Sequence, residues 1–424
     1  MTGSRLRWHQ RPLRLTVANG SFMKRLCLPL VVGLLATTDS VAQLLNPHAS
    51  ETIGTVQQVY DGALLPDIQV NTFRNIDRLF PTRVVRHGNH VYPLPGSDQP
   101  LRNVRFKSDG KDVDLYDYVS LNRVSGLLVI KNGKIVLESY QLGNTAHTQW
   151  MSMSVVKSIT ATLIGAAIKD GHISGIDDPL TRYLPELSGS AYDGVSVRHL
   201  LQMTSGVKWD ETYTDPTSDR RRMLDAQVAQ QPGAVLALMA RLPRVAAPGS
   251  RWNYSTGETQ VAAALLRAAV RMPLADYLSD RIWARFGMES DATWWLESPN
   301  GVEVGGSGLS ATLRDYGRVG LFLLAEGRVG SEHILPDGWV KEASTPKAVG
   351  GRSVDYGYML WPIPNSTGTI NDSAFEAHGI FGQHVYVNPR ENVVVVVWSA
   401  QAKPTGKAIV RDDDFFAAVS LAVR

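Results

Sequence analysis

Residues 150–171 read WMSMSVVKSITATLIGAAIKDG, and the interpretation of the whole chain starts from them. Apolar side chains recur here at steps of three and four residues, which predicts a helix with one face in the core. Gly171 is expected to end this helix. Ser154 and Lys157 are three positions apart, so their side chains share a helix face and can touch. A buried lysine has a lowered pKa and can take the proton of a serine as that serine attacks a carbonyl.

The Ser-x-x-Lys pattern does not identify a nucleophile by itself, because the chain contains it at four other places. These begin at Ser21, Ser108, Ser205 and Ser344. The first lies in an expected targeting segment, two contain glycine and one contains proline, which is typical of turns. Only Ser154 begins a long apolar helix. The alternative for Ser154 is an ordinary serine that caps the helix.

The first 42 residues are typical of an exported protein. Met23-Lys-Arg precedes an apolar run from Leu26 to Ala36 and a small-residue end at Ala42, which predicts a secretory signal peptide with cleavage after Ala42. Residues 1–22 are interpreted as an upstream extension. The apolar run is too short to span a bilayer, so no stable membrane anchor is expected. We therefore predict a periplasmic or secreted protein.

Composition excludes several kinds of function. Cys27 is the only cysteine and lies in the signal segment, so the mature chain has neither disulfides nor a catalytic thiol. Residues 1–42 carry six Lys or Arg and one acid, and their removal changes the net charge from +3 to −2. A weakly acidic protein of 382 residues lacks the basic surface that nucleic acid requires. The histidines are scattered without a His-Glu-x-x-His run, so no metal site or cofactor is expected.

Local patterns outline the organisation. We expect an N-terminal arm over residues 43–115, partly extended, and a hydrolase domain over residues 116–424. A hairpin is predicted over residues 127–140, with Asn132-Gly133 at its turn, and a second hairpin over residues 382–398. A helix is predicted from Asp412 to Val423, and a largely helical lobe over about residues 175–330. Strands at both ends with helices between them predict an α+β fold with one antiparallel sheet.

Three motifs in order then suggest a family. Ser154-x-x-Lys157, Tyr254-Ser-Thr256 and Ala377-His-Gly-Ile380 together resemble the serine β-lactamase and penicillin-binding superfamily. The resemblance covers about residues 115–424. The resemblance is stronger to the class C-like esterase and amidase branch, which includes the 6-aminohexanoate-dimer hydrolases. It implies a β-lactamase/transpeptidase-like fold, an antiparallel sheet flanked by helices beside an all-helical lobe, with the active site between them.

The resemblance also implies residue roles. Ser154 is similar to the family nucleophile, Lys157 to the residue that takes its proton, and Tyr254 to the tyrosine that passes the proton to the leaving group. A neighbouring ammonium is expected to lower the pKa of that phenol. The backbone N–H groups of Ser154 and Ile380 would form the oxyanion hole.

Four further residues are candidates for substrate binding. Tyr213 is similar to a tyrosine that contacts amide substrates in the amidase branch, and its alternative is an exposed loop tyrosine. His378, Gly379 and Gln383 are expected to line the pocket, and their alternative is ordinary hydrogen bonding at a strand end.

Departures from the family pattern bear on the substrate. Where class C β-lactamases have Lys-Thr-Gly, this chain has Ala377-His-Gly379, and it has Thr256 in place of the family asparagine. The missing lysine is the cation that would bind the carboxylate of a β-lactam or a peptide. We therefore expect an exported serine hydrolase that cleaves small esters or amides through an acyl-serine intermediate. 6-Aminohexanoate-like linear amides are possible substrates.

Alternative functions stay open. A D,D-peptidase or β-lactamase would need another cation at the cleft, for which Arg318 and Lys347 are candidates. A non-catalytic penicillin-binding-like sensor domain would keep the motifs without productive geometry. An α/β-hydrolase is disfavoured because the chain lacks a Gly-x-Ser-x-Gly elbow. The expected partner is a small-molecule ester or amide, and the sequence leaves the oligomeric state open.

Overall fold

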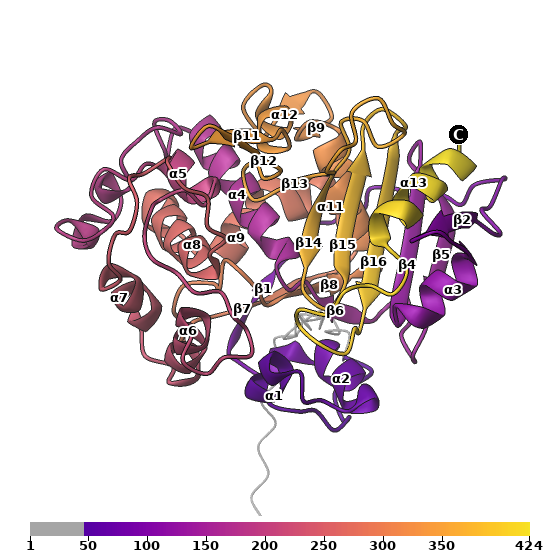
Figure 1. Cartoon of the computed structure of the whole chain (residues 1–424), viewed down its shortest axis with the longest axis horizontal. Coiled ribbons are helices and arrows are strands. Elements are labelled where there is room, and N and C mark those ends of the chain that lie inside the picture. Colours follow the sequence, from indigo (N-terminus) through magenta and orange to yellow (C-terminus); the bar gives the residue numbers. More distant parts are fainter. Residues whose placement is uncertain (1–45) are drawn as a thin grey trace, which may run out of the picture. The chain divides into compact units, whose positions relative to one another are not determined.

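The central feature of the computed structural model, which describes residues 46–424, is a six-stranded antiparallel sheet built from both ends of the chain (Figure 1). Its strand order is β13-β14-β15-β16-β4-β5. The strands are β4 (Val124–Lys131), β5 (Lys134–Tyr140), β13 (Trp361–Pro362), β14 (Phe375–Gly379), β15 (Gln383–Asn388) and β16 (Val393–Ser399). Both predicted hairpins and the single sheet from the two termini are confirmed.

Turn chemistry and burial explain the two hairpins. Asn132 and Gly133 between β4 and β5 have φ of 51° and 74°, the left-handed conformation that Asn-Gly turns favour. All seven residues of β16 are buried, because the strand lies inside the sheet with helices on both faces. The continuous run of valines is therefore a central strand.

The alternation of side chains along β16 divides the core into two layers. Val394, Val396 and Trp398 belong to one cluster with the helices α4 (Val155–Lys169) and α11 (Leu313–Leu324). Val393, Val395 and Val397 belong to a second cluster with α3 (Leu115–Leu121) and α13 (Asp412–Ala422). Successive strand residues point to opposite faces, so the sheet is covered on both sides (Figure 1).

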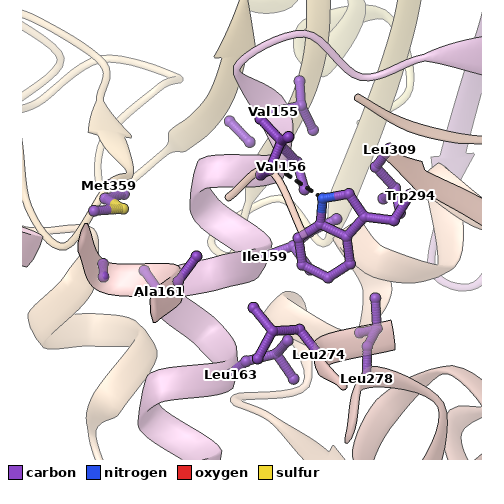
Figure 2. Packing of buried hydrophobic residues seen from close by; sticks show 14 of the residues in the cluster. Val155, Val156, Ile159, Ala161, Leu163, Leu274, Leu278, Trp294, Leu309 and Met359 are labelled. Carbon is purple, nitrogen blue, oxygen red and sulfur yellow. Dashed lines mark hydrogen bonds between the residues drawn. The ribbon is translucent and has the colours of Figure 1, made fainter. Parts of the chain in front are cut away.

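Helix α4 is the predicted nucleophile helix. It runs from Val155 to Lys169 and is buried over almost its whole circumference, and Gly171 follows it with φ of 80°. Val156, Ile159 and Leu163 pack against Trp294 and neighbouring leucines (Figure 2). A helix buried on all sides is held by its neighbours, which fixes the position of its first turn.

A helical lobe lies on the other side of α4, at the left of Figure 1. It contains α5 (Val197–Leu201), α6 (Asp219–Val228), α7 (Ala234–Ala240), α8 (Thr256–Val270) and α9 (Leu274–Leu278). Short 3-10 turns η2 (Leu180–Arg182) and η3 (Pro185–Leu187) precede it, and the π-turn η4 (Ser279–Trp283) and α10 (Ala284–Phe286) follow it.

The range expected for the lobe also contains strands. A four-stranded sheet in the order β1-β7-β8-β6 joins β1 (Thr82–Val85), β6 (Gln149–Met151), β7 (Ala292–Trp295) and β8 (Leu309–Thr312). Strand β6 ends three residues before Ser154, so this second sheet helps to position the nucleophile. Short elements lie between α11 and β13 in the chain: β9 (Arg328–Val329), β10 (Glu332–His333), α12 (Trp339–Ala343), β11 (Lys347–Val349) and β12 (Arg352–Val354).

The N-terminal segment is more ordered than a partly extended arm. It contains α1 (Val56–Asp61), α2 (Pro66–Phe73), the 3-10 turn η1 (Ile76–Arg78), β1, and the hairpin of β2 (Arg105–Ser108) and β3 (Lys111–Asp114). A capping box between Thr55 and Gln58 begins α1, and Pro66 begins α2. Both helix starts are thus marked by residues within the segment itself.

The structure describes residues 46–424 as a single unit, and the expected signal peptide lies outside them. Within these residues no helix combines the length and apolarity that crossing a membrane requires.

Candidate active site

Ser154 lies at the start of α4, directly before Val155. It is partly accessible, whereas Met153 before it and Val155 after it are buried. Met153 has φ of 43°, an uncommon conformation for a residue with a side chain. Ser154 occupies the N-cap position, yet its side chain makes no capping hydrogen bond. Its Oγ lies 2.9 Å from Lys157 Nζ instead, which argues against a purely capping serine.

Lys157 has the environment of a base. Its side chain is buried, and Nζ donates a hydrogen bond to the Gly306 carbonyl at 2.8 Å. The pKa of Lys157 is lowered to about 7: burial is the largest cause, the Glu211 carboxylate opposes it, and the Arg220 guanidinium adds to the lowering. Near neutral pH a large fraction of the amine is therefore unprotonated and able to accept the Ser154 proton.

Tyr254 lies beside this pair, in the loop that leads into α8. Lys157 Nζ is 5.3 Å from the centre of its ring, and the ring contacts Tyr356 and Trp361. Burial raises the pKa of Tyr254, the Glu211 carboxylate raises it further, and a hydrogen bond with Ser154 acts against both. The expectation of a lowered phenol pKa was wrong, because desolvation outweighs any effect of the lysine. Tyr254 is a neutral phenol that can donate or relay a proton.

The glycine-rich run before β8 lets the backbone approach the site. A Cβ on Gly306 would lie 2.8 Å from Thr256 Cγ2 and 3.2 Å from Lys157 Nζ. Gly308 has φ of 86°, and a Cβ there would overlap the Trp295 ring. These glycines therefore hold a carbonyl against the lysine, a role that sequence spacing did not reveal.

Glu211 is a site residue that sequence reasoning missed. Its carboxylate accepts hydrogen bonds from the Thr256 backbone N–H at 2.8 Å, from the Thr256 hydroxyl and from the Trp209 indole. It thus joins the loop at 209–213 to the start of α8, two residues after Tyr254. Tyr213 in the same loop was predicted as a substrate contact, but an isolated acid in a loop carries no pattern that marks it.

The end of β14 runs beside the nucleophile. A Cβ on Gly379 would lie 2.7 Å from the Ser152 carbonyl oxygen and 2.9 Å from Met153 Cβ, so only glycine fits. Ile380 follows directly. Within residues 46–424, neither the Ser154 nor the Ile380 backbone N–H donates to another backbone group. Both amides are thus available as the two oxyanion donors that the family resemblance implies.

Tyr213 is buried near the same site. Its ring stacks on Tyr60 with centroids 6.2 Å apart, and its pKa is raised well above the usual value by burial, with the Glu211 carboxylate second. Tyr213 is therefore not an exposed loop tyrosine. Its contact with a substrate stays a prediction.

Gln383 and His378 lie on opposite faces of the sheet. Gln383 is buried, and its Nε2 donates to the Ser399 carbonyl at 2.9 Å, which joins β15 to β16. It also lines a small cavity with Ser152 and Val155, which flank Met153 and Ser154 in the chain. The His378 ring stacks on His384 with centroids 4.5 Å apart, and His384 contacts Phe416 of α13. Because strand residues alternate, His378 points to the α13 face while Gly379 faces Met153. Gln383 therefore lies near the start of α4 with a structural hydrogen bond, whereas His378 is turned away from Ser154.

The other described Ser-x-x-Lys matches have different surroundings. Ser108 and Lys111 form the turn of the β2–β3 hairpin, and Ser205 donates to the Glu258 carboxylate. Lys347 bonds to Glu342 at 2.7 Å, after α12. The match at Ser21 lies outside the described residues. Of the four described matches, only Ser154 brings hydroxyl and amine together at a partly open helix start.

The arrangement is suited to acyl transfer. A serine hydroxyl, an amine whose pKa is near 7 and a neutral phenol lie together, beside two backbone N–H groups from different elements. Such a group can form and then hydrolyse an acyl-serine without a metal or an organic cofactor.

Known proteins resemble this chain in sequence and in fold. The Beta-lactamase family model matches residues 122–418. A 6-aminohexanoate-dimer hydrolase of Paenarthrobacter ureafaciens is 28% identical over 348 residues, which cover 78% of this chain and 85% of that protein. Esterase EstB of Burkholderia gladioli is 28% identical over 198 residues, covering 45% of this chain and 48% of the esterase.

A solved structure shows the same fold. A putative 6-aminohexanoate-dimer hydrolase from Bacillus anthracis superposes with a TM-score of 0.70 at 23% identity, covering 84% of this chain and 92% of that chain. The predicted α+β fold, an antiparallel sheet with helices, is confirmed. With the family model spanning the serine helix, the tyrosine loop and the β14 edge, the chain belongs to the beta-lactamase family.

Proposed function

We propose that this protein is an exported serine hydrolase that cleaves small esters or linear amides through an acyl-Ser154 intermediate. The observation that carries the proposal is the 2.9 Å contact between Ser154 Oγ and the buried Lys157 amine, whose pKa is about 7. The relatives named as an amide-dimer hydrolase and an esterase support this substrate class.

The proposed reaction begins with the unprotonated Lys157 amine. It takes the Ser154 proton as Oγ attacks the substrate carbonyl, and the Ser154 and Ile380 N–H groups stabilise the oxyanion. The proton then passes through Tyr254 to the leaving alcohol or amine. Water then attacks the acyl carbonyl and gives a proton to the same pair of groups. That proton passes to Ser154 Oγ as the bond between Oγ and the acyl carbon breaks, which releases the acid and restores free Ser154.

Two observations weigh against a preference for β-lactams or cell-wall peptides. Ala377 stands where the family lysine is expected. The two candidate replacement cations are already engaged: Arg318 bonds to Asp315 and Glu289 at 3.0 Å each, and Lys347 bonds to Glu342 at 2.7 Å. A cation bound to carboxylates is poorly placed to recognise a substrate carboxylate.

A substrate panel tests the proposal. The purified chain and its Ser154→Ala variant are given a short-chain p-nitrophenyl ester, a linear 6-aminohexanoate dimer and a chromogenic cephalosporin. We expect ester or amide turnover that the variant lacks, with the cephalosporin hydrolysed more slowly. Cephalosporin turnover faster than both would favour the β-lactamase alternative, and no turnover of any substrate would favour a sensor domain.

Export is tested separately. The full 424-residue chain is expressed in a Gram-negative host, and the intact mass of the periplasmic product is measured. We expect a chain that begins at Gln43. A product that keeps residues 1–42 and stays in the cytoplasm would contradict the proposed export.

A further inference from the structure

A cluster of metal-ligating side chains lies behind the β14 edge, on the opposite face from Ser154. Glu376 and His378 are two residues apart on β14 and so share one face of the sheet. His384 of β15 is the direct cross-strand partner of His378. The two histidines are six positions apart in the chain, and the hairpin brings their rings into a stack.

We propose that Glu376, His378 and His384 form a binding site for a zinc-like transition-metal dication. One ligand atom from each of the three lies within 4.8 Å of the others. Glu376 Oε2 is 2.7 Å from His384 Nδ1, and Glu376 Oε1 is 3.6 Å from His378 Nδ1. Zinc bonds of about 2.0–2.1 Å place tetrahedral ligand atoms about 3.3 Å apart, so small side-chain shifts would complete the site.

The surroundings match those of a metal-binding histidine. The other ring nitrogen of His384, Nε2, is buried and lies 3.4 Å from Asp412 Oδ2, without a hydrogen bond of good geometry. Asp412 in turn accepts a hydrogen bond from the Tyr118 hydroxyl at 2.7 Å. Metal-ligating histidines commonly direct their second nitrogen to a carboxylate, which orients the ring and raises its basicity.

The exposure of His378 and the charges around the site both favour the binding of a cation from solution. The His378 side chain is 45% exposed, whereas His384 is 2% exposed, so one ligand lies at the mouth of the site and one at its base. The Glu376 and Asp412 carboxylates both face the His384 ring, so negative charge lies beside the site. Mixed nitrogen and oxygen ligands favour zinc over Mg²⁺ or Ca²⁺, which prefer oxygen alone. Water would supply the remaining ligand.

The site has a direct connection to the oxyanion strand. His378 is followed by Gly379 and Ile380, so a bound ion would tie that end of β14 to β15 and to the first residue of α13. The inference does not depend on the proposed hydrolysis. Its test therefore measures metal binding itself.

Zinc titration of the chelator-treated chain tests the proposal by calorimetry, and the visible spectrum after Co²⁺ addition reports the ligand geometry. We expect one ion per chain. His378→Ala removes a half-exposed side chain that would bind the ion directly. Loss of an outer-shell partner lowers metal affinity roughly 10- to 100-fold, and loss of this direct ligand should lower it more. Asp412→Asn should weaken it within that range. His147→Ala removes an exposed histidine before β6 and should leave binding unchanged.

Thermal unfolding of each variant without metal shows whether it is folded. The proposal is overturned if the wild-type chain binds no zinc. It is also overturned if folded His378→Ala binds as tightly as wild type, or if His147→Ala weakens binding equally. In each case the histidines would be ordinary partners of Glu376.

Discussion

The pH dependence of Ser154 acylation follows from the environment of Lys157. The amine must be unprotonated to accept the serine proton, and burial lowers its pKa from 10.5 to about 7. Because the folded-state pKa is lowered, the active neutral form predominates above pH 7 and is lost as the pH falls below it. We therefore expect kcat/KM to rise with pH to a plateau, with a midpoint near 7.

The size of the effect follows from the same value. Each pH unit below the midpoint lowers the neutral fraction about tenfold, so about one lysine in a hundred is neutral at pH 5. We expect kcat/KM at pH 5 to be about 100-fold below its value at pH 9. With an unshifted pKa of 10.5, activity would still be rising steeply at pH 9.

A p-nitrophenyl ester assay from pH 5 to pH 9 measures this profile. Rates with Ser154→Ala at each pH are subtracted to remove hydrolysis by hydroxide. Lys157→Arg is a second variant, because a guanidinium stays protonated throughout the range and should give no enzymatic rate at any pH. A flat profile, or a folded Lys157→Arg variant with the wild-type profile, would refute the assignment of Lys157 as the base.

Three further variants test other parts of the site. Tyr254→Phe should lower kcat for amide hydrolysis by about 10²- to 10⁴-fold. It should lower kcat for p-nitrophenyl ester hydrolysis less, because p-nitrophenolate leaves without taking up a proton. Equal losses on both substrates would contradict proton delivery by Tyr254. Gly379→Ala should lower kcat by about 10²- to 10³-fold by displacing the oxyanion strand, whereas Gly175→Ala, where a Cβ meets open space, should not. Glu211→Gln removes a carboxylate that raises the Lys157 pKa, so the midpoint of the pH profile should move to lower pH, and a move upward would contradict this.

The sequence predicted elements that depend on local patterns. The apolar spacing after Ser154 predicted a buried helix, and Asn132-Gly133 predicted a hairpin turn; both are present, and both patterns lie within a few consecutive residues. Motif order then predicted the family, which the family model confirms. Each of these inferences required only residues close in the chain, or the order of short motifs along it.

Features that depend on register or long-range packing were missed. Glu211 reaches the site through hydrogen bonds to residues about 45 positions away, and no local pattern marks it. His378 was expected at the pocket, but the pleat of β14 turns its side chain toward α13. Arg318 was considered as a substrate-binding cation, yet its partners Asp315 and Glu289 come together only in the fold.

The Tyr254 pKa shows a further limit. A neighbouring lysine was expected to lower it, but the aromatic rings of Tyr356 and Trp361 are among the groups that bury the phenol. Burial is the largest contribution and raises the pKa. The degree of burial of a loop residue depends on segments about 100 positions later in the chain, which sequence patterns alone do not place.

The central claim is that Ser154 is an activated nucleophile, and labelling with a small fluorophosphonate tests it most directly. The intact mass of the purified chain is measured after exposure, with Ser154→Ala as the control. We predict a single adduct on wild-type protein and none on the variant. An unlabelled wild-type chain, or an adduct that persists in Ser154→Ala, would contradict the account.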